Sequence, residues 1–257
     1  MLNHTTHTDA KQINSVDVVS PQIGGLIPLT TIDFPEHLSA VVFCQGCSWR
    51  CSYCHNPHLI PRNVKTDISW HDIKLFLKQR QKFLEGVVFS GGEPLLQMEF
   101  LIEFFKKCKE RNINTCLDTS GSTFSYEKIK KFDELIKYID LVMLDIKHID
   151  PIEHQKLVKF ELQPVLDFAN YLSNRKVNLR IRHVVIPNIT LNDEHLIKLG
   201  KFLKTITFAE IEVLKYHTMA LDKYKKLDME YPLKDTPDCT SEEALRAKKL
   251  LLYVIQN

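Results

Sequence analysis

Four cysteines lie close together in the segment FCQGCSWRCSYCHN. Three of them, Cys47, Cys51 and Cys54, have the spacing C-x-x-x-C-x-x-C, which suits thiolates that wrap around a compact iron–sulfur cluster. Three thiolates on a four-iron cluster leave one iron without a protein ligand, and an open coordination position distinguishes a reactive metal centre from a structural one. The segment therefore predicts a centre at which a small molecule can bind a metal and react.

Cys44 supports a different interpretation of the same segment. With Cys44 the spacing becomes C-x-x-C-x-x-x-C-x-x-C, which is enough for a closed four-thiolate site holding zinc or a ferredoxin-like electron-transfer cluster. His55, beside Cys54, adds a further ligand that zinc accepts. Cys44 also ends the apolar run AVVF, where a buried thiol would be ordinary. The segment alone leaves the open and the closed site as alternatives.

The other three cysteines are scattered. Cys108 and Cys116 lie in apolar stretches, and we predict that both are small buried hydrophobic residues. Cys239 lies in the polar stretch TPDCTSEE without a metal-binding neighbour, so we assign it no role.

Composition limits the classes of protein to which the chain can belong. Its 257 residues are 44% hydrophobic and 26% charged, as in an ordinary globular protein. A formal net charge of +2 is too small to indicate a nucleic acid or a membrane surface as partner, and no run approaches the ~20 apolar residues of a membrane span. The polar opening lacks the apolar core of a signal peptide. We expect a cytoplasmic protein, in which cysteines stay reduced and serve metals more often than disulfides.

Short β-type runs alternate with helical runs along most of the chain. Residues 1–21 read as a flexible N-terminal extension, and residues 22–257 as one domain. Six strands are expected at 39–44, 86–90, 114–118, 141–146, 178–186 and 209–217. Helices are expected at 69–84, with Ser69 as N-cap, and at 98–111, 125–139, 151–160, 164–174, 193–205 and 241–256.

This alternation predicts an α/β fold with a parallel sheet and right-handed crossovers. The sheet could be open and doubly wound, or curled into part of a β/α barrel. Unusual residues follow the ends of five strands, and in a barrel such ends converge on one face, where an active site is built. We therefore predict a partial (β/α)6 TIM-like barrel. The five groups are Cys44–Cys54, Ser90–Pro94, Asp118–Gly121, Asp145–Lys147 and Tyr216–His217.

The segments FCQGCSWRCSYCHN, VVFSGGEP, CLDTSG and VMLDIK, in this order, resemble the radical S-adenosylmethionine (SAM) superfamily. Within it, the chain resembles the activating enzymes of glycyl-radical enzymes, from about residue 23 to its C-terminus. The resemblance implies a barrel of the radical SAM type and a site-differentiated [4Fe–4S] cluster on Cys47, Cys51 and Cys54. It also implies that SAM chelates the open iron through its amino and carboxylate groups.

The resemblance further implies which residues surround SAM. Gly91, Gly92 and Glu93 match the motif that receives the methionine amino group, where glycine allows close backbone approach. No catalytic residue beyond the cluster and SAM is expected. The other matching positions are Tyr53, His55 and Asn56 beside the cluster and adenine, Asp118, Thr119, Met143 and Asp145 at a small monovalent cation site near the SAM carboxylate, and Lys147, Arg182 and His217 around SAM.

In the family that the chain resembles, a reduced cluster passes one electron to the SAM sulfonium, which yields methionine and a 5′-deoxyadenosyl radical. That radical takes a hydrogen from a glycine Cα of a partner enzyme, leaving a stored radical there. The resemblance implies two protein partners: a glycyl-radical enzyme as substrate, and a flavodoxin or ferredoxin-type electron donor.

The resemblance is mixed as to which enzyme is activated. The stretches LVMLDIKHID, IRHVVIP and KYKKLDMEYPL resemble pyruvate formate-lyase activases. The opening GGLIPLTTIDFPEHLSAVVFCQGC lacks the D-G-P-G segment of that family and resembles activating proteins of the anaerobic ribonucleoside-triphosphate reductase. Two other classes stay open: a radical SAM enzyme acting on a small molecule, and a non-enzymatic zinc or ferredoxin-like protein.

Overall fold

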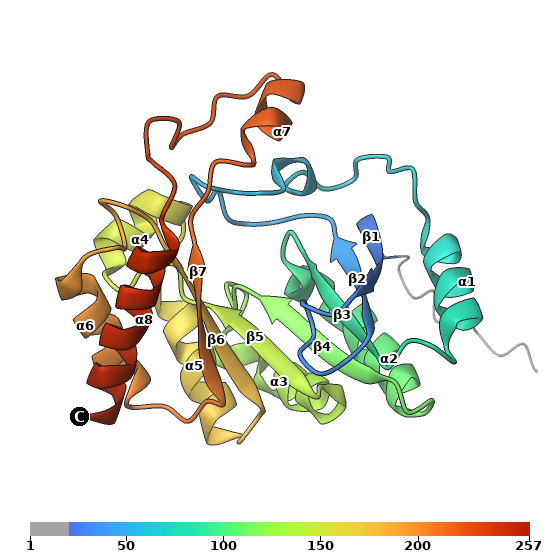
Figure 1. Ribbon diagram of the computed structural model, residues 1–257. Helices are drawn as coiled ribbons and strands as arrows, with labels where there is room; N and C mark the ends of the chain where they lie inside the picture. Colours follow the sequence, from blue (N-terminus) through green and yellow to red (C-terminus); the bar gives the residue numbers. More distant parts are fainter. Residues whose placement is uncertain (1–20) are drawn as a thin grey trace, which may run out of the picture.

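A single mostly parallel sheet forms the centre of the molecule (Figure 1). The computed structural model describes residues 21–257, so the predicted flexible extension, except for Pro21, lies outside the described residues. The strands follow one another in sheet order; β1 is antiparallel to β2, and each later neighbour is parallel. Their bounds are β1 Ile23–Thr30, β2 Ser39–Cys44, β3 Gly86–Gly91, β4 Asn114–Thr119, β5 Leu141–Asp145, β6 Leu179–Val185 and β7 Glu210–Lys215.

The central strands are buried on both faces, which explains their nearly continuous apolar runs. One set of side chains, including Phe89, Leu117 and Leu144, belongs to the large core that the strands share with the helices. A second, smaller cluster contains Val88, Cys116 and Met143. Residues of the two clusters alternate along the strands, so the smaller cluster fills the opposite, inner face of the sheet. The predicted burial of Cys108 and Cys116 is confirmed, at 3% and 0% exposure.

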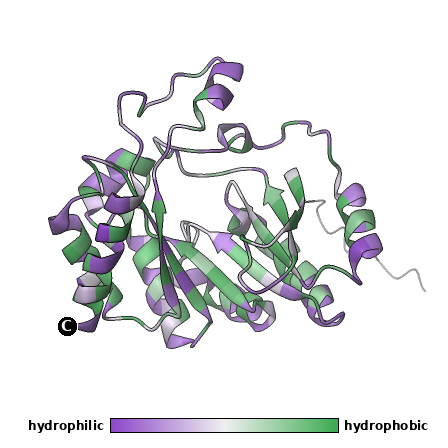
Figure 2. Ribbon diagram, in the orientation of Figure 1, coloured by the Kyte–Doolittle hydropathy of each residue, from purple (hydrophilic) through white to green (hydrophobic). Residues whose placement is uncertain are grey.

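Helices cover the outer face of the curved sheet, with their polar sides turned to solvent (Figures 1 and 2). The predicted cap is confirmed, because Ser69 forms a capping box with Asp72. Asn192 caps α6, where its side chain accepts a hydrogen bond from the backbone N–H of His195. The helices are α1 Trp70–Arg80, α2 Met98–Lys109, α3 Ile129–Leu135, α4 Pro151–Val158, α5 Gln163–Asn174, α6 Asp193–Leu203, α7 Leu221–Lys226 and α8 Ser241–Gln256.

Two elements differ from the sequence prediction. The sheet has seven strands and not six, because β1 precedes the first expected strand. β1 reads IGGLIPLT, and its two glycines and its proline are poor strand formers that an edge strand tolerates. The short α7 lies where only a loop was expected, since it has six residues and buries only Tyr224.

The sheet thus curves into a partial β/α barrel with β1 at one edge and β7 at the other. Among the described residues, no helix combines the length and the apolar character that a membrane span requires. The carboxyl ends of β2 to β7 lie at one end of the barrel, where the segments predicted to carry chemistry meet.

Candidate active site

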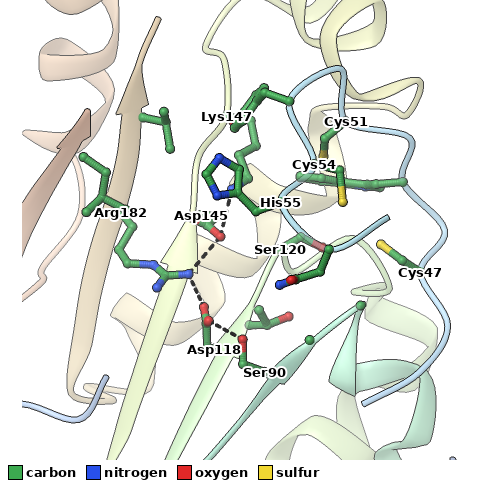
Figure 3. A pocket seen from close by; sticks show the side chains of 18 of the residues that line it. Cys47, Cys51, Cys54, His55, Ser90, Asp118, Ser120, Asp145, Lys147 and Arg182 are labelled. Carbon is green, nitrogen blue, oxygen red and sulfur yellow. Dashed lines mark hydrogen bonds and ion pairs between the residues drawn. The ribbon is translucent and has the colours of Figure 1, made fainter. Parts of the chain in front are cut away.

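A cavity of about 630 Å³ opens at the carboxyl ends of the parallel strands (Figure 3). It brings together nearly all the residues that the sequence analysis selected, which come from six separate segments of the chain. Among the selected residues, only Glu93 and Met143 do not line it. Those that do are Cys47, Cys51, Tyr53, Cys54, His55, Asn56, Gly91, Gly92, Asp118, Thr119, Asp145, Lys147, Arg182 and His217.

Backbone hydrogen bonds on two sides hold the cysteine loop over the cavity. At its start, the loop is closed on its own later part, where Cys47 N–H donates to Ile60 O (3.1 Å). Further along, Arg50 N–H donates to Val158 O and Ser52 N–H to Leu157 O, both at 2.9 Å, at the end of α4. The loop is therefore anchored independently of any ligand.

The three predicted ligand thiols line the cavity, as Figure 3 shows. Burial raises the pKa of Cys47 to about 12, with the nearby Glu93 carboxylate adding to the effect, and burial also raises the pKa of Cys54. A coordinating metal deprotonates a thiol outright. Within residues 21–257, no group of three or more His, Cys, Asp or Glu side chains is placed to hold a single metal ion.

Cys44 has a different environment from the other three cysteines of the segment. Its side chain is fully buried in the large core, and it does not line the cavity. Cys47, Cys51 and Cys54 are each partly exposed. Three thiols and not four therefore face the cavity, which favours the open site over the closed four-cysteine site.

Gly91 and Gly92 let the end of β3 pass against the cysteine loop. Gly91 has φ +114°, and a Cβ there would lie 2.5 Å from Cys44 O. A Cβ on Gly92 would lie 2.2 Å from Gly46 O. Both glycines also border the cavity, so they leave backbone accessible to a ligand.

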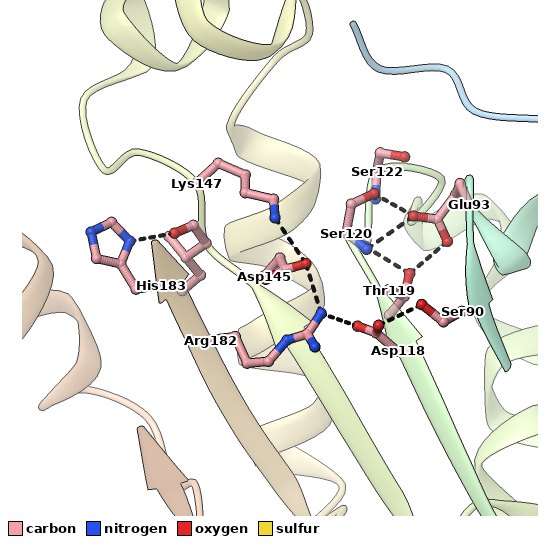
Figure 4. Close-up of polar contacts among 12 residues, drawn as sticks. Ser90, Glu93, Asp118, Thr119, Ser120, Ser122, Asp145, Lys147, Arg182 and His183 are labelled. Atoms are coloured by element: carbon pink, nitrogen blue, oxygen red, sulfur yellow. Dashed lines mark hydrogen bonds and ion pairs between the residues drawn. The ribbon is translucent and has the colours of Figure 1, made fainter. Parts of the chain in front are cut away.

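Glu93, by contrast, is fully buried and connects two loops. Its carboxylate accepts hydrogen bonds from Thr119 Oγ1 (2.6 Å), Leu95 N–H (3.0 Å), and both the backbone N–H (2.9 Å) and the hydroxyl of Ser120 (Figure 4). Because three of its four hydrogen bonds come from Thr119 and Ser120, the Glu93 carboxylate holds the loop after β4 in position. The part of Glu93 in the motif that receives the methionine amino group, which the resemblance implied, stays a prediction.

Replacing Glu93 with glutamine is expected to destabilise this junction. The glutamine amide group would turn an N–H₂ towards a donor, so we expect the free energy of unfolding to fall by about 2–3 kcal/mol. Denaturant titration measures the change. Glu99→Gln is the matched control, because Glu99 pairs with Lys131 at the exposed surface, where loss of a pair costs under about 1 kcal/mol. Equal stability of Glu93→Gln and the parent protein would contradict the assignment.

A chain of charged side chains crosses the cavity wall (Figures 3 and 4). Arg182 Nη2 bonds both Asp118 Oδ1 and Asp145 Oδ2, the latter at 3.1 Å, and Lys147 Nζ lies 3.0 Å from the same Asp145 oxygen. Ser90 Oγ donates to Asp118 at 2.6 Å. Burial acts to raise the pKa of Asp145, but the two cations outweigh it and hold that pKa below its usual value. Burial raises the pKa of Asp118 despite Arg182.

Several polar atoms on the cavity wall are buried and have no partner among residues 21–257. A buried polar group without a hydrogen bond is costly, so such atoms mark places where a polar ligand gains free energy on binding. Their number on one wall fits a cavity that holds a polar cofactor. They are Tyr53 OH, Asp145 Oδ1, Arg182 Nε, His217 Nδ1 and Trp49 Nε1.

Aromatic side chains form the part of the wall next to the cysteines. The rings of His55 and His217 meet edge to face at 4.4 Å, and Lys147 Nζ lies 5.6 Å from the Tyr53 ring centroid. Burial lowers the pKa of His55 to about 4, with His217 adding to the effect, so His55 is neutral at pH 7. Flat rings of this kind are suited to stacking with an aromatic base.

His183 fixes the end of β5 from behind the cavity. It is fully buried, and its Nδ1 donates to Ile146 O at 2.7 Å, which holds the peptide between Asp145 and Lys147 (Figure 4). His154, also fully buried, makes the equivalent bond to Phe160 O at 2.9 Å. Burial lowers the pKa of both imidazoles to about 4.

These two histidines make the fold sensitive to acid. Their ordinary pKa is near 6.5, so below that pH the unfolded chain binds protons that the folded chain excludes. Each is expected to remove about 2 kcal/mol from the free energy of unfolding between pH 7 and pH 5. Urea titrations at both pH values measure the loss. The double variant His154→Gln/His183→Gln should lose less on acidification, and an unchanged loss would contradict this expectation.

Other lining residues were not selected from the sequence. Asp33 lies on the segment between β1 and β2 and accepts a hydrogen bond from Thr30 Oγ1 at 2.6 Å. The sequence analysis made no prediction for this segment, because β1 was not anticipated. Ser90 and Ser120 lie in segments that were selected, but their own hydroxyls were not.

Comparisons with known proteins agree with this geometry. The model of the radical SAM superfamily matches residues 41–200. The pyruvate formate-lyase-activating enzyme of Listeria monocytogenes is 40% identical over 228 residues, which cover 86% of this chain and 92% of that protein. The enzyme of the same name from Clostridium pasteurianum is 34% identical over 244 residues, covering 93% of this chain and all of that protein.

Solved structures support the fold. A radical SAM methyltransferase from Sphaerobacter thermophilus superposes with a TM-score of 0.64 at 15% identity, covering 86% of this chain and 65% of that chain. A domain of a pyruvate-formate lyase-activating enzyme from Bacteroides vulgatus superposes with a TM-score of 0.54 at 22% identity, covering 66% of this chain and 94% of that one. The chain therefore belongs to the radical SAM superfamily and, within it, to the family of the pyruvate formate-lyase-activating enzymes.

Proposed function

We propose that this chain cleaves SAM reductively at a [4Fe–4S] cluster on Cys47, Cys51 and Cys54 and thereby installs a glycyl radical on a partner enzyme. The observation that carries the proposal is the cavity itself. Three thiols face it while Cys44 is buried elsewhere, and unpartnered polar atoms line the same wall. The donor set fits a cluster with one iron left open to a ligand.

When bound, the cluster and SAM would supply the chemistry, which is one-electron reductive cleavage of the S–C5′ bond. The chain's own residues bind the cluster and SAM, orient them and shield them from water. Gly91 and Gly92 leave backbone open to the methionine amino group, and the ion-paired Lys147 and Arg182 offer positive charge to its carboxylate. Tyr53, His55, Asn56 and His217 provide the wall for the adenosine end.

We also propose that a monovalent cation binds near the SAM carboxylate, at Asp118, Thr119 and Asp145. Asp145 Oδ1 supports this, since it is buried and has no partner among residues 21–257. Arg182 already bridges the other oxygens of the two carboxylates, so the cation would use the oxygen that Arg182 leaves free. Met143 lies deeper, in the inner core cluster of the sheet, and would contribute at most its backbone.

The partner that the family relationship favours is pyruvate formate-lyase. The relatives at 34–40% identity carry that enzyme in their names and match the chain over most of its length. An incomplete barrel suits a protein substrate, because a side that no strand closes admits a loop from another molecule. The activating role for anaerobic ribonucleoside-triphosphate reductase is the alternative, because the segment before Cys44 lacks the D-G-P-G pattern.

Transfer of the radical to each candidate partner tests the proposal. The reconstituted, reduced protein would be incubated anaerobically with SAM and either pyruvate formate-lyase or the reductase, and the glycyl radical counted by EPR. We expect a radical on pyruvate formate-lyase that depends on SAM. A radical only on the reductase would reassign the partner, and SAM cleavage with a radical on neither would exclude both.

A further inference from the structure

Two neighbouring residues of β6 hold the end of β5 from opposite faces of the sheet. Arg182 lies on the cavity side, where it bonds Asp145 Oδ2 at 3.1 Å. His183 is the next residue, so its side chain points to the opposite face, where its Nδ1 lies 2.7 Å from Ile146 O (Figure 4). A carbonyl oxygen only accepts hydrogen bonds, so the proton of this bond belongs to His183 Nδ1.

The position of this proton determines what the second ring nitrogen of His183 can do. Burial lowers the pKa of His183 to about 4, so the ring is neutral at pH 7 and carries a single N–H. With that proton on Nδ1, Nε2 is an acceptor. The other neutral tautomer would direct a lone pair at Ile146 O and break the bond between them. His183 therefore needs a donor at Nε2 to keep the tautomer that holds β5.

His195, in the first turn of α6, supplies that donor. Its Nε2 lies 3.2 Å from His183 Nε2, and two lone pairs at this distance would repel each other, so the His195 proton is on Nε2. Burial, with the nearby His183 adding to the effect, lowers the pKa of His195 to about 2, so this ring is neutral as well. The backbone of His195 is also held, because its N–H donates to Asn192 Oδ1 at 2.8 Å.

The two hydrogen bonds lead from α6 to the Ile146 carbonyl, which lies between two residues of the cavity wall, Asp145 and Lys147. We propose that His195 is a positioning residue for SAM. By donating to His183 it keeps the Ile146 carbonyl in place and, through it, the paired charges of Asp145 and Lys147. His195 itself does not line the cavity. This inference rests on the proposed function, in which the cations of the cavity wall meet the SAM carboxylate.

Two variants of His195 separate the effect of its hydrogen bond from that of its packing. His195→Gln places an amide N–H₂ where the imidazole Nε2–H was, whereas His195→Asn is one methylene too short to reach His183. Both variants keep a polar amide at the site. Leu199→Ala is the matched control for lost stability, because Leu199 is fully buried one turn further along α6.

The experiment has two parts, both on the reconstituted protein with its cluster oxidised. Nitrogen-15 NMR of the parent protein labelled at histidine shows which ring nitrogens carry protons, and we expect protons on His183 Nδ1 and His195 Nε2. The backbone amide signal of Lys147, which shares a peptide group with Ile146 O, should move in His195→Asn and stay near its parent position in His195→Gln.

Anaerobic titration calorimetry then measures the Kd for SAM. We expect it to rise about fivefold or more in His195→Asn, because the charges that meet the SAM carboxylate lose their support. In His195→Gln and in Leu199→Ala the Kd should stay within about twofold of the parent value.

Three results would overturn the inference. They are a proton on Nδ1 of His195, a Kd for SAM in His195→Asn equal to that of the parent, and an equal rise of the Kd in Leu199→Ala, which would assign the effect to lost stability of α6. A parent protein that does not bind SAM would count against the proposed function. The histidine tautomers and the Lys147 amide signal would then still decide whether His195 holds the Ile146 carbonyl.

Discussion

Cys47→Ala, Cys51→Ala and Cys54→Ala are each expected to abolish SAM cleavage, whereas Cys44→Ala keeps both cluster and activity. The three residues line the cavity, and removing any one leaves only two thiolates for a cluster that needs three. Cys44 belongs to the core, so its loss removes packing volume and no ligand. Iron and sulfide analysis after anaerobic reconstitution, with 5′-deoxyadenosine measured alongside, checks both statements.

The Cys44→Ala protein separates the open site from the closed one. About four irons per chain and activity near that of the parent would fit three ligands. Cys116→Ala is a matched control, because Cys116 is equally buried but belongs to the inner core cluster. If Cys44→Ala stays folded by circular dichroism and loses its iron while Cys116→Ala retains it, the site has four cysteine ligands and the account of an open iron is wrong.

Asp145→Asn is expected to have the second largest effect, on both SAM affinity and stability. Asp145 pairs with Arg182 and Lys147, and all three side chains are largely shielded from solvent. Removing the carboxylate charge leaves two neighbouring cations without their shared partner, which costs about 3 kcal/mol or more at such sites. The cations would also repel each other and shift, so we expect the Kd for SAM to rise by about tenfold or more.

Isothermal titration with SAM under anaerobic conditions and urea unfolding measure the two effects of Asp145→Asn. Asp133→Asn is the control, because Asp133 pairs with Arg175 at the surface, away from the cavity, where solvent screens the pair. SAM affinity should not change in that control. An Asp145→Asn protein that binds SAM as tightly as the parent would show that the charged chain across the cavity does not hold the cofactor.

The sequence predicted the parallel part of the sheet because those strands are buried on both faces. Runs such as AVVF and LVMLD are unbroken by polar residues, so their position and type are clear. β1 was not predicted, since Gly24, Gly25 and Pro28 conceal an edge strand that is stabilised only by its pairing with β2. Asp33, which depends on that strand for its position, was missed for the same reason.

Most of the cavity wall was also predicted, because family motifs place residues at strand ends that a barrel brings together. The role of Glu93 could not be predicted in this way. The resemblance placed it in the motif that receives the methionine amino group, but nothing in the sequence shows that its carboxylate also binds Thr119 and Ser120, which are distant in sequence. Likewise, nothing in the sequence shows that His183 binds Ile146 O, because that bond joins β6 to the end of β5.

The same dependence on tertiary contacts applies to Cys44. Spacing alone allowed it as a fourth ligand, and only its direction into the core excluded it from the cavity wall. Cys44 is the last residue of β2, and the alternation of side chains along that strand points it, like Val42, into the large core. The number of clustered cysteines in a sequence therefore does not by itself give the number of metal ligands; the structure is needed to show which thiols face the site.

The most direct test of an open iron at Cys47, Cys51 and Cys54 is EPR spectroscopy of the reconstituted, dithionite-reduced protein with and without SAM. We predict a four-iron signal that changes when SAM is added, together with formation of 5′-deoxyadenosine. A cluster whose spectrum is indifferent to SAM and that yields no 5′-deoxyadenosine, or zinc in its place, would contradict the account.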